Sequence, residues 1–453
     1  MRRISVRSVL LASTIAMSTA TTAYADSQWA AATTTFPGNI RAGSREVPVK
    51  PGDKTVVAIK NLQAGTTVTM LNGTEVLTPK PLTTDEKGNL NIPLTVPADA
   101  ATGLHPLTVI TQNPASVSLV MLKLSRIVPP KNTEAFRLQT TSVGERAYQS
   151  AVSADGKLFV TSARGPKDGS RLMRLNAGTL AIEAEATLPK DKKGEQIGVF
   201  GVGVDNAHNQ VWTTNTLAET VTVYDAKTLS VVKVFPEGSV SHPRDVVIDE
   251  ANNRAYVSAA LTGFVEVYDT KTLEHIGQLE FVVERGKNLF NSTDLTLDST
   301  GGKLYGVSRD TPWVGWIDLK TGKSTTVKVS QAQGATDIAR DPQTGRLYVA
   351  SQETNNVVVL DADGKVLADT YIGAGGVSVV WDPLTSQVFA ATRAGGTVAV
   401  LNKDGKLVAN IPMDNTPNNL SAGPDGAVYL VSMYGTTRDK VQTGSVTKIT
   451  AQK

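Results

Sequence analysis

The sequence predicts an all-β protein of two domains, a β-sandwich followed by a seven-bladed β-propeller. The stronger observation is a repeat between residues 133 and 453, in which an aromatic residue recurs every 40 to 53 positions. A unit of this length holds four short strands, which is the content of one propeller blade. The second observation is a series of short apolar runs between residues 26 and 130. Turn residues such as Asn72-Gly73 separate these runs, as is typical of an antiparallel sandwich.

Residues 1–25 are predicted to be a secretory signal peptide. Arg2, Arg3 and Arg7 precede a short apolar core at Val9–Met17, and Ala23-Tyr24-Ala25 matches a cleavage site. The apolar core is too short to span a membrane, and no later run is long enough. We therefore expect a protein exported to the periplasm or the medium, without a membrane span. The chain has no cysteine, so its stability cannot depend on disulfides.

The charge balance argues against a general affinity for polyanions. The chain has 45 basic and 42 acidic residues, and removal of the three leader arginines leaves 42 of each. A nearly neutral mature chain gives no overall attraction to nucleic acid or to an anionic membrane.

The first domain, residues 26–130, is predicted from runs of alternating apolar residues. Strands are expected at 55–59, 67–70, 90–96, 106–110 and 117–122, with weaker candidates at 47–49 and 75–77. The segment Thr84–Val109 resembles bacterial immunoglobulin-like domains of cell-surface proteins. The resemblance implies a spacer or docking module. Val128–Asn132, with two adjacent prolines, predicts a stiff linker to the second domain, residues 133–453.

Two markers define the repeats of the second domain. The second strand of each predicted blade carries an aromatic residue, namely Phe159, Trp212, Tyr256, Tyr305, Tyr348, Phe389 and Tyr429. Six predicted third strands end in Asp or Asn, namely Asn176, Asp225, Asp269, Asp318, Asp361 and Asn402. Seven copies of the first marker predict seven blades.

The ends of the repeat region predict how the ring closes. The last unit ends near Ser445–Thr450 without a fourth strand, and Phe136–Thr141 lies ahead of the first unit as a strand without a blade. We expect this early strand to complete the seventh blade, so that no sheet edge stays open.

The repeat units resemble a known family of propellers. DPQTGRLYVASQETNNVVVLD, from Asp341, and DEANNRAYVSAALTGFVEVYDTKT, from Asp249, are similar to the YVTN-type repeat. Together with the leader and the segment Val143–Ala163, they resemble the bacterial periplasmic YncE-like proteins. The resemblance implies an exported seven-bladed propeller, in some cases able to bind single-stranded DNA.

One position on each innermost strand is the first candidate for chemistry. These positions are Gln149, Gly201, Asp245, Asp294, Asp337, Ser378 and Asn419. Three consecutive blades place Asp245, Asp294 and Asp337 at one level of the channel, where converging carboxylates would hold a divalent cation. Such a cation could activate water in a metal-dependent hydrolase or lyase. The alternative is that the acids bond backbone amides of a neighbouring blade, or pair with Arg244.

The second candidate is the face where the loops between blades meet the loops between second and third strands. Its predicted ligand-binding residues are Arg164, Arg171, Arg244, Arg309, Trp313, Arg393 and Tyr434. Arginines pair with phosphates and aromatic rings stack on bases, so single-stranded DNA is one candidate ligand. A protein or a small ligand is the other.

The leading hypothesis is a non-enzymatic binding or scaffold protein that uses this face. We expect a monomer whose partner is an envelope protein or a small ligand, with no catalytic residue assigned and no cofactor beyond a divalent cation in the channel. Single-stranded DNA binding and metal-dependent hydrolysis are the alternatives.

Overall fold

The computed structural model describes residues 35–44, 47–165, 169–284, 287, 290–413, 415–435 and 443–452. The predicted signal peptide lies outside the described residues. Contacts divide the chain into two compact units. The first contains residues 59–90 and 108–119, and the second contains 40–58, 91–107 and the described chain from residue 120 onward.

The N-terminal strands form two sheets. One sheet has the order β1 (Asn39–Ala42), β2 (Lys54–Lys60) and β6 (Leu90–Thr95). The other has the order β4 (Glu75–Val76), β3 (Thr67–Asn72), β7 (Gly103–Gln112) and β8 (Ser116–Leu124), with β5 (Leu82–Thr83) also paired to β3. All five clearly predicted strands are present, whereas β1 and β5 were not predicted. Both are short, and β5 follows a proline, so neither shows a clear alternation of apolar residues.

From residue 136 onward, four-stranded antiparallel sheets repeat seven times in the described residues. The first strands are β10 (Ala147–Val152), β14 (Val202–Asp205), β18 (Pro243–Asp249), β22 (Ser292–Asp298), β26 (Ala335–Arg340), β30 (Gly376–Asp382) and β34 (Asn415–Ala422). The second strands are β11 (Lys157–Gly165), β15 (Gln210–Asn215), β19 (Arg254–Ala259), β23 (Lys303–Ser308), β27 (Leu347–Ser351), β31 (Gln387–Thr392) and β35 (Val428–Gly435).

The outer halves of the sheets follow the same pattern. The third strands are β12 (Gly169–Asn176), β16 (Thr220–Asp225), β20 (Phe264–Asp269), β24 (Trp313–Asp318), β28 (Asn356–Leu360), β32 (Thr397–Asn402) and β36 (Gly444–Ala451). The fourth strands are β13 (Ile182–Glu185), β17 (Val231–Val234), β21 (Glu274–Glu280), β25 (Ser324–Lys328), β29 (Val366–Tyr371), β33 (Leu407–Pro412) and β9 (Phe136–Gly144).

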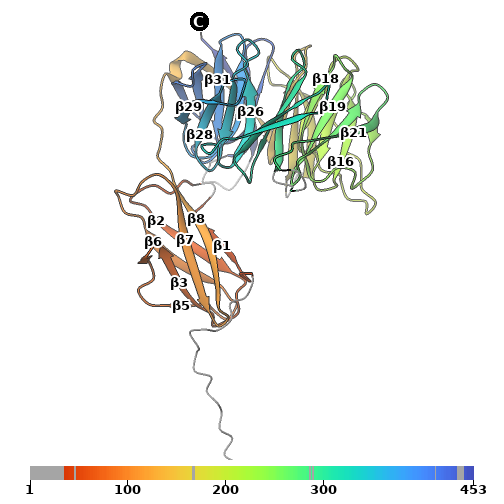
Figure 1. Ribbon diagram of the computed structural model, residues 1–453. Coiled ribbons are helices and arrows are strands. Elements are labelled where there is room, and N and C mark those ends of the chain that lie inside the picture. Colours follow the sequence, from red (N-terminus) through yellow and green to blue (C-terminus); the bar gives the residue numbers. More distant parts are fainter. Residues whose placement is uncertain are drawn as a thin grey trace, which may run out of the picture. The chain divides into compact units, whose positions relative to one another are not determined.

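The contacts between the repeated sheets close them into a ring. Figure 1 shows this ring from the side, with sheets such as those of β18 and β26 labelled. The first strand of each sheet contacts the first strand of the next, and β34 contacts β10. The closure is the predicted one, because β9 pairs antiparallel with β36 from Phe136–Ala451 to Gly144–Gly444. The earliest strand of the ring thus fastens its last sheet, and the edge that β36 would leave open is paired.

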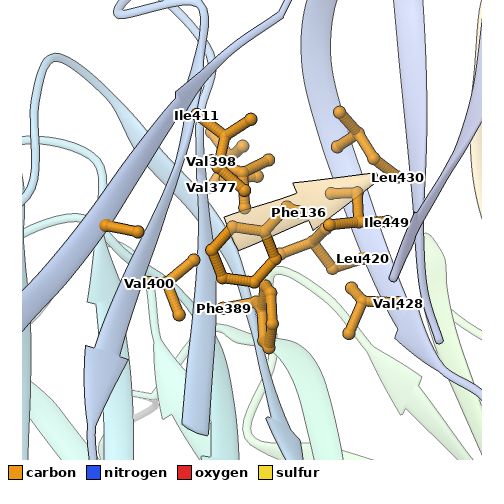
Figure 2. Close-up of a cluster of buried hydrophobic side chains, with 12 residues drawn as sticks. Phe136, Val377, Phe389, Val398, Val400, Ile411, Leu420, Val428, Leu430 and Ile449 are labelled. Carbon is orange, nitrogen blue, oxygen red and sulfur yellow. The ribbon is translucent and has the colours of Figure 1, made fainter. Parts of the chain in front are cut away.

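The core lies between neighbouring sheets, and the aromatic markers belong to it. All seven markers are buried. Figure 2 shows one such cluster, where Phe136 of β9 lies among side chains of the last two sheets. Its ring meets the Phe389 ring edge to face at 5.9 Å. The repeat in the sequence is therefore a packing repeat, which explains its regularity.

The Asp or Asn at the end of the third strand shapes the turn that follows. In all six marked sheets, a side-chain oxygen accepts a hydrogen bond from a backbone N–H two or three residues further along. Asp269 Oδ1, for example, accepts from Thr272 N at 2.8 Å. These are Asx turns, so the second sequence marker also has a local structural cause.

The segment between the N-terminal strands and the ring follows the ring surface. The Tyr371 hydroxyl bonds the backbone N–H and C=O of Arg126 at 2.8 and 2.9 Å. Lys131 pairs with Asn410 in an isolated bridge ahead of η1, a 3-10 turn at Thr133–Ala135. No helix among the described residues is long and apolar enough to cross a membrane.

Candidate functional site

The polar positions predicted on the first strands link each sheet to the next. Five of these side chains accept a hydrogen bond from a backbone N–H of the next sheet. The donor is in each case the residue directly after the equivalent position in that sheet. Asp245 accepts from Leu295 at 3.1 Å, and Asp337 accepts from Val379 at 2.7 Å. The sequence-based alternative, in which acids bond backbone amides of a neighbouring blade, is confirmed for these two residues.

The first strands are irregular at this level, which exposes two successive residues to the channel. Six of the seven change register within three residues of the polar position. A regular strand points successive side chains to opposite faces, whereas a bulge redirects one of them. Adjacent residues such as Asn418 and Asn419 consequently line the same cavity.

Gly201 is the one of these seven positions that has no side chain, and the side chain of Gln149 spans the gap that it leaves. A Cβ at Gly201 would lie 2.3 Å from the carbonyl oxygen of Arg244 and 3.0 Å from Gln149 Oε1. Gln149 accepts from the Val202 N–H at 3.2 Å and donates from Nε2 to Asp245 Oδ1 at 2.9 Å. The longer side chain therefore reaches two sheets along the ring, through space that any side chain at position 201 would occupy.

The three predicted acids do come together, in an environment that disfavours their charge. Asp245 and Asp337 are buried, and Asp294 is half-buried beside the central cavity. Burial, opposed by hydrogen bonds from Gln149 and Leu295, raises the pKa of Asp245 from 3.8 to about 6. Burial and the neighbouring Asp337 and Asp245 also raise the pKa of Asp294, and its carboxyl shares a hydrogen bond with that of Asp337.

The carboxyl oxygens of these acids are already used by hydrogen bonds. Both oxygens of Asp245 accept, and Asp337 accepts from Ser378, Val379 and its own neighbour Ile338. Among the described residues, no group of three or more His, Cys, Asp or Glu has a metal-binding arrangement. Hard cations need several oxygens that point at a common centre. Asp294 is the member with the least hydrogen bonding to backbone amides.

Asp245, Asp294 and Asp337 form an acid layer across the channel. A polar cavity of about 90 Å³, here called the upper cavity, opens at the centre of the ring on one side of this layer. Its floor includes Gln149, Asp294, Asp337 and Asn419. A second cavity, of about 310 Å³, is lined by the same four residues from the other side. The acid layer therefore separates two parts of the central channel.

Three arginines line the upper cavity. Arg244 comes from β18 directly before Asp245, whereas Arg309 and Arg393 directly follow the second strands β23 and β31. Burial and the charges of Arg309 and Arg244 lower the pKa of Arg393, so the three guanidinium groups influence one another. In the part of the chain that the structure describes, none of them forms an ion pair with an acid.

Neutral groups hold these arginines in place. Arg393 donates from Nη2 to Asn418 Oδ1, and Arg309 Nη2 lies 3.4 Å from Gln352 Oε1. The Arg244 guanidinium lies 5.6 Å from the centre of the Tyr148 ring. Arg393 Nε is buried and has no hydrogen-bond partner. The cavity therefore concentrates positive charge together with unused donor capacity.

The other predicted face residues are placed differently. Trp313 packs against the cluster that contains Phe281 and Phe290 and does not line the cavity. Arg171 forms a bidentate pair with Glu185, with Nε–Oε1 2.8 Å and Nη2–Oε2 2.5 Å. Tyr434 is half-buried, and its ring centre lies 6.0 Å from the Arg146 guanidinium. The side chain of Arg164 lies outside the described part of the structure.

Sequence reasoning did not select Tyr148, Gln352 and Asn418, which also line the cavity. Two of them precede a polar position on a first strand, and Gln352 follows a second strand, as Arg309 and Arg393 do. The repeat register could have identified them, because equivalent positions of each blade meet at the ring centre.

Comparisons with known proteins identify the fold. Neither the protein-family models nor the curated proteins match the sequence. Solved propeller-type structures do match, among them Kuenenia stuttgartiensis hydrazine synthase, at 16% identity and a TM-score of 0.54. That match covers 65% of this chain and 94% of the other. The RRP9 WD40 repeats match at 10% identity and a TM-score of 0.55, over 72% of this chain and 100% of theirs.

This chain therefore has an all-β fold of repeated four-stranded sheets, of the kind found in WD40 and other propellers. At these identities, the likeness extends to the fold alone.

Proposed function

We propose that this protein is an exported seven-bladed propeller of the YVTN type, preceded by an immunoglobulin-like domain at residues 26–130, that binds a partner without catalysing a reaction. The seven sheets of the ring and their closure by β9 support the propeller. The apolar leader with its A-x-A site supports export. The YVTN-type repeats at Asp249 and Asp341 support the family.

The binding site of this proposal is the upper cavity. The single observation that carries it is the convergence of Arg244, Arg309 and Arg393 on one polar cavity without an acidic partner among the described residues. Grouped like charges are unfavourable for stability, so a structural role alone does not account for them. A propeller offers such a site at its centre, where loops of many blades meet, and its fold fits a binding or scaffold role.

Single-stranded DNA is the second candidate ligand, because phosphates pair with arginine. The metal-dependent hydrolase or lyase receives less support. Asp245 and Asp337 use both carboxyl oxygens to accept hydrogen bonds, so Asp294 is the acid at the upper cavity with the fewest bonds to backbone amides.

A pull-down from the native cell envelope tests the proposal. The bait is the mature protein, compared with an Arg244→Gln/Arg309→Gln double variant and with Arg171→Gln. The third bait loses one arginine that is bound to Glu185 and lies outside the cavity. We expect a partner that the wild type and Arg171→Gln retain and the double variant loses. Equal recovery with all three baits, or none with any, would contradict a binding site at this cavity.

A further inference from the structure

We propose that the upper cavity binds one compact anionic group, a carboxylate or phosphate of a small ligand, between Arg244, Arg309 and Arg393. This inference rests on the binding role proposed above and specifies the chemistry of the ligand. Three properties of the cavity support it, namely its charge, its unused donors and its size.

The charge of the cavity is unbalanced. Three guanidinium groups line it, against two acids, Asp294 and Asp337, and burial raises the pKa of both carboxyls, which disfavours their charged forms. Guanidinium groups stay protonated under all ordinary conditions. An anion placed between them would remove the mutual repulsion that lowers the pKa of Arg393.

The arginines also offer donors that the described protein does not use. An arginine has five N–H donors. Arg244 makes no side-chain hydrogen bond among the described residues, and Arg309 makes one at 3.4 Å. Arg393 is oriented by Asn418, yet its buried Nε lacks a partner. An oxyanion supplies several acceptor lone pairs in a small volume, which suits donors that approach from different sides.

The size of the cavity favours a compact group over a polymer. Its volume of about 90 Å³ has room for several water molecules. A carboxylate or phosphate is of this scale, whereas a nucleotide is much larger. Binding of single strands also depends on aromatic faces that are open to bases. Tyr148 already contacts Arg244 and, edge to face at 5.4 Å, Phe200, while Trp313 packs against a core cluster.

Titration calorimetry on the mature protein tests this inference, with inorganic phosphate, citrate and a single-stranded oligothymidine as separate probes. We expect phosphate, citrate or both to bind at one site, and the better probe identifies the anionic group. Arg309→Gln should weaken that binding at least about tenfold, since it removes a charge-assisted hydrogen bond. Arg171→Gln should leave it unchanged.

Thermal unfolding of each variant confirms that it is folded, and Arg309 is preferred over Arg393 because it is held less tightly. The inference is overturned if neither small anion binds, or if both variants bind equally well. It is also overturned if the oligothymidine binds more tightly than either anion and with a steep salt dependence, because the site would then recognise a polymer. A partner retained in the pull-down without binding of either anion would overturn this inference and leave the proposed function intact.

Discussion

Replacing Asp294 by Asn should stabilise the protein at alkaline pH and leave it unchanged in acid. A carboxyl whose pKa is raised on folding binds more protons in the folded than in the unfolded state, so its contribution to stability falls as the pH rises between the two values. For Asp245 this window runs from 3.8 to about 6, which corresponds to about 3 kcal/mol. Asp294 is shifted in the same direction by burial and by two neighbouring acids.

The amide of Asn can donate to Asp337 as the protonated carboxyl of Asp294 does, but it cannot acquire charge. We therefore expect Asp294→Asn to raise the free energy of unfolding by about 1 to 3 kcal/mol at pH 8 and to change it little at pH 4. Urea unfolding followed by tryptophan fluorescence at pH 4, 5, 6, 7 and 8 measures the difference. A loss of stability of the same size at pH 4 and pH 8 would refute the reasoning, because the carboxyl would then act through shape and not through charge.

Three further predictions concern the ring. Gly201→Ala should lower the free energy of unfolding by about 1 to 3 kcal/mol, because its Cβ would approach the Arg244 carbonyl at 2.3 Å; an unchanged urea midpoint would contradict this. Phe136→Ala should cost about 3 to 5 kcal/mol by emptying the site beside Phe389, and a loss under about 1 kcal/mol would mean that β9 does not hold the ring closed. Asp318→Ala should lower the melting temperature at pH 7 and lower it less at pH 3. The Thr321 hydroxyl and N–H donate to Asp318 and lower its pKa. The contribution of Asp318 to stability is therefore present above the unfolded-state pKa and is lost as the pH falls through the folded-state pKa. Equal effects at both pH values would contradict this.

The ring could be predicted from the sequence because its markers have strong local causes. The aromatic residue of the second strand is buried in every sheet, and the Asp or Asn that ends the third strand forms an Asx turn in each marked sheet. Closure by Phe136–Gly144 was also predictable, because a strand without a blade and a blade without a fourth strand complement each other. The short strands β1 and β5 have no such marker, and they were missed.

The arginine cavity was predicted only in part, because its geometry depends on bulges. In a regular strand, Tyr148 and Gln149 would point to opposite faces, but the register shift in β10 brings both to the cavity. Periodicity cannot predict such a shift, since it is set by packing between sheets. Arg244, Arg309 and Arg393 were selected for their chemistry, and the structure brings them together. Trp313 was selected on the same grounds and packs in a core cluster instead.

The acid layer shows that the role of a side chain at one position of a repeat depends on the residues at the equivalent positions of the neighbouring sheets. Three acids in consecutive sheets predicted a metal site, yet the same position in the next sheets supplies backbone donors to two of them. Gly201 occupies the same position in its sheet but has no side chain, and it makes room for Gln149 to reach Asp245. Asp294 is the remaining exception, because the amide it would be expected to bond, that of Ile338, donates to Asp337. The ring thus places three arginines on the same cavity as Asp294 and Asp337, whose pKa values are raised by burial. Because burial disfavours the charge of these acids and, among the described residues, they form no ion pair with the arginines, the cavity is suited to an anion.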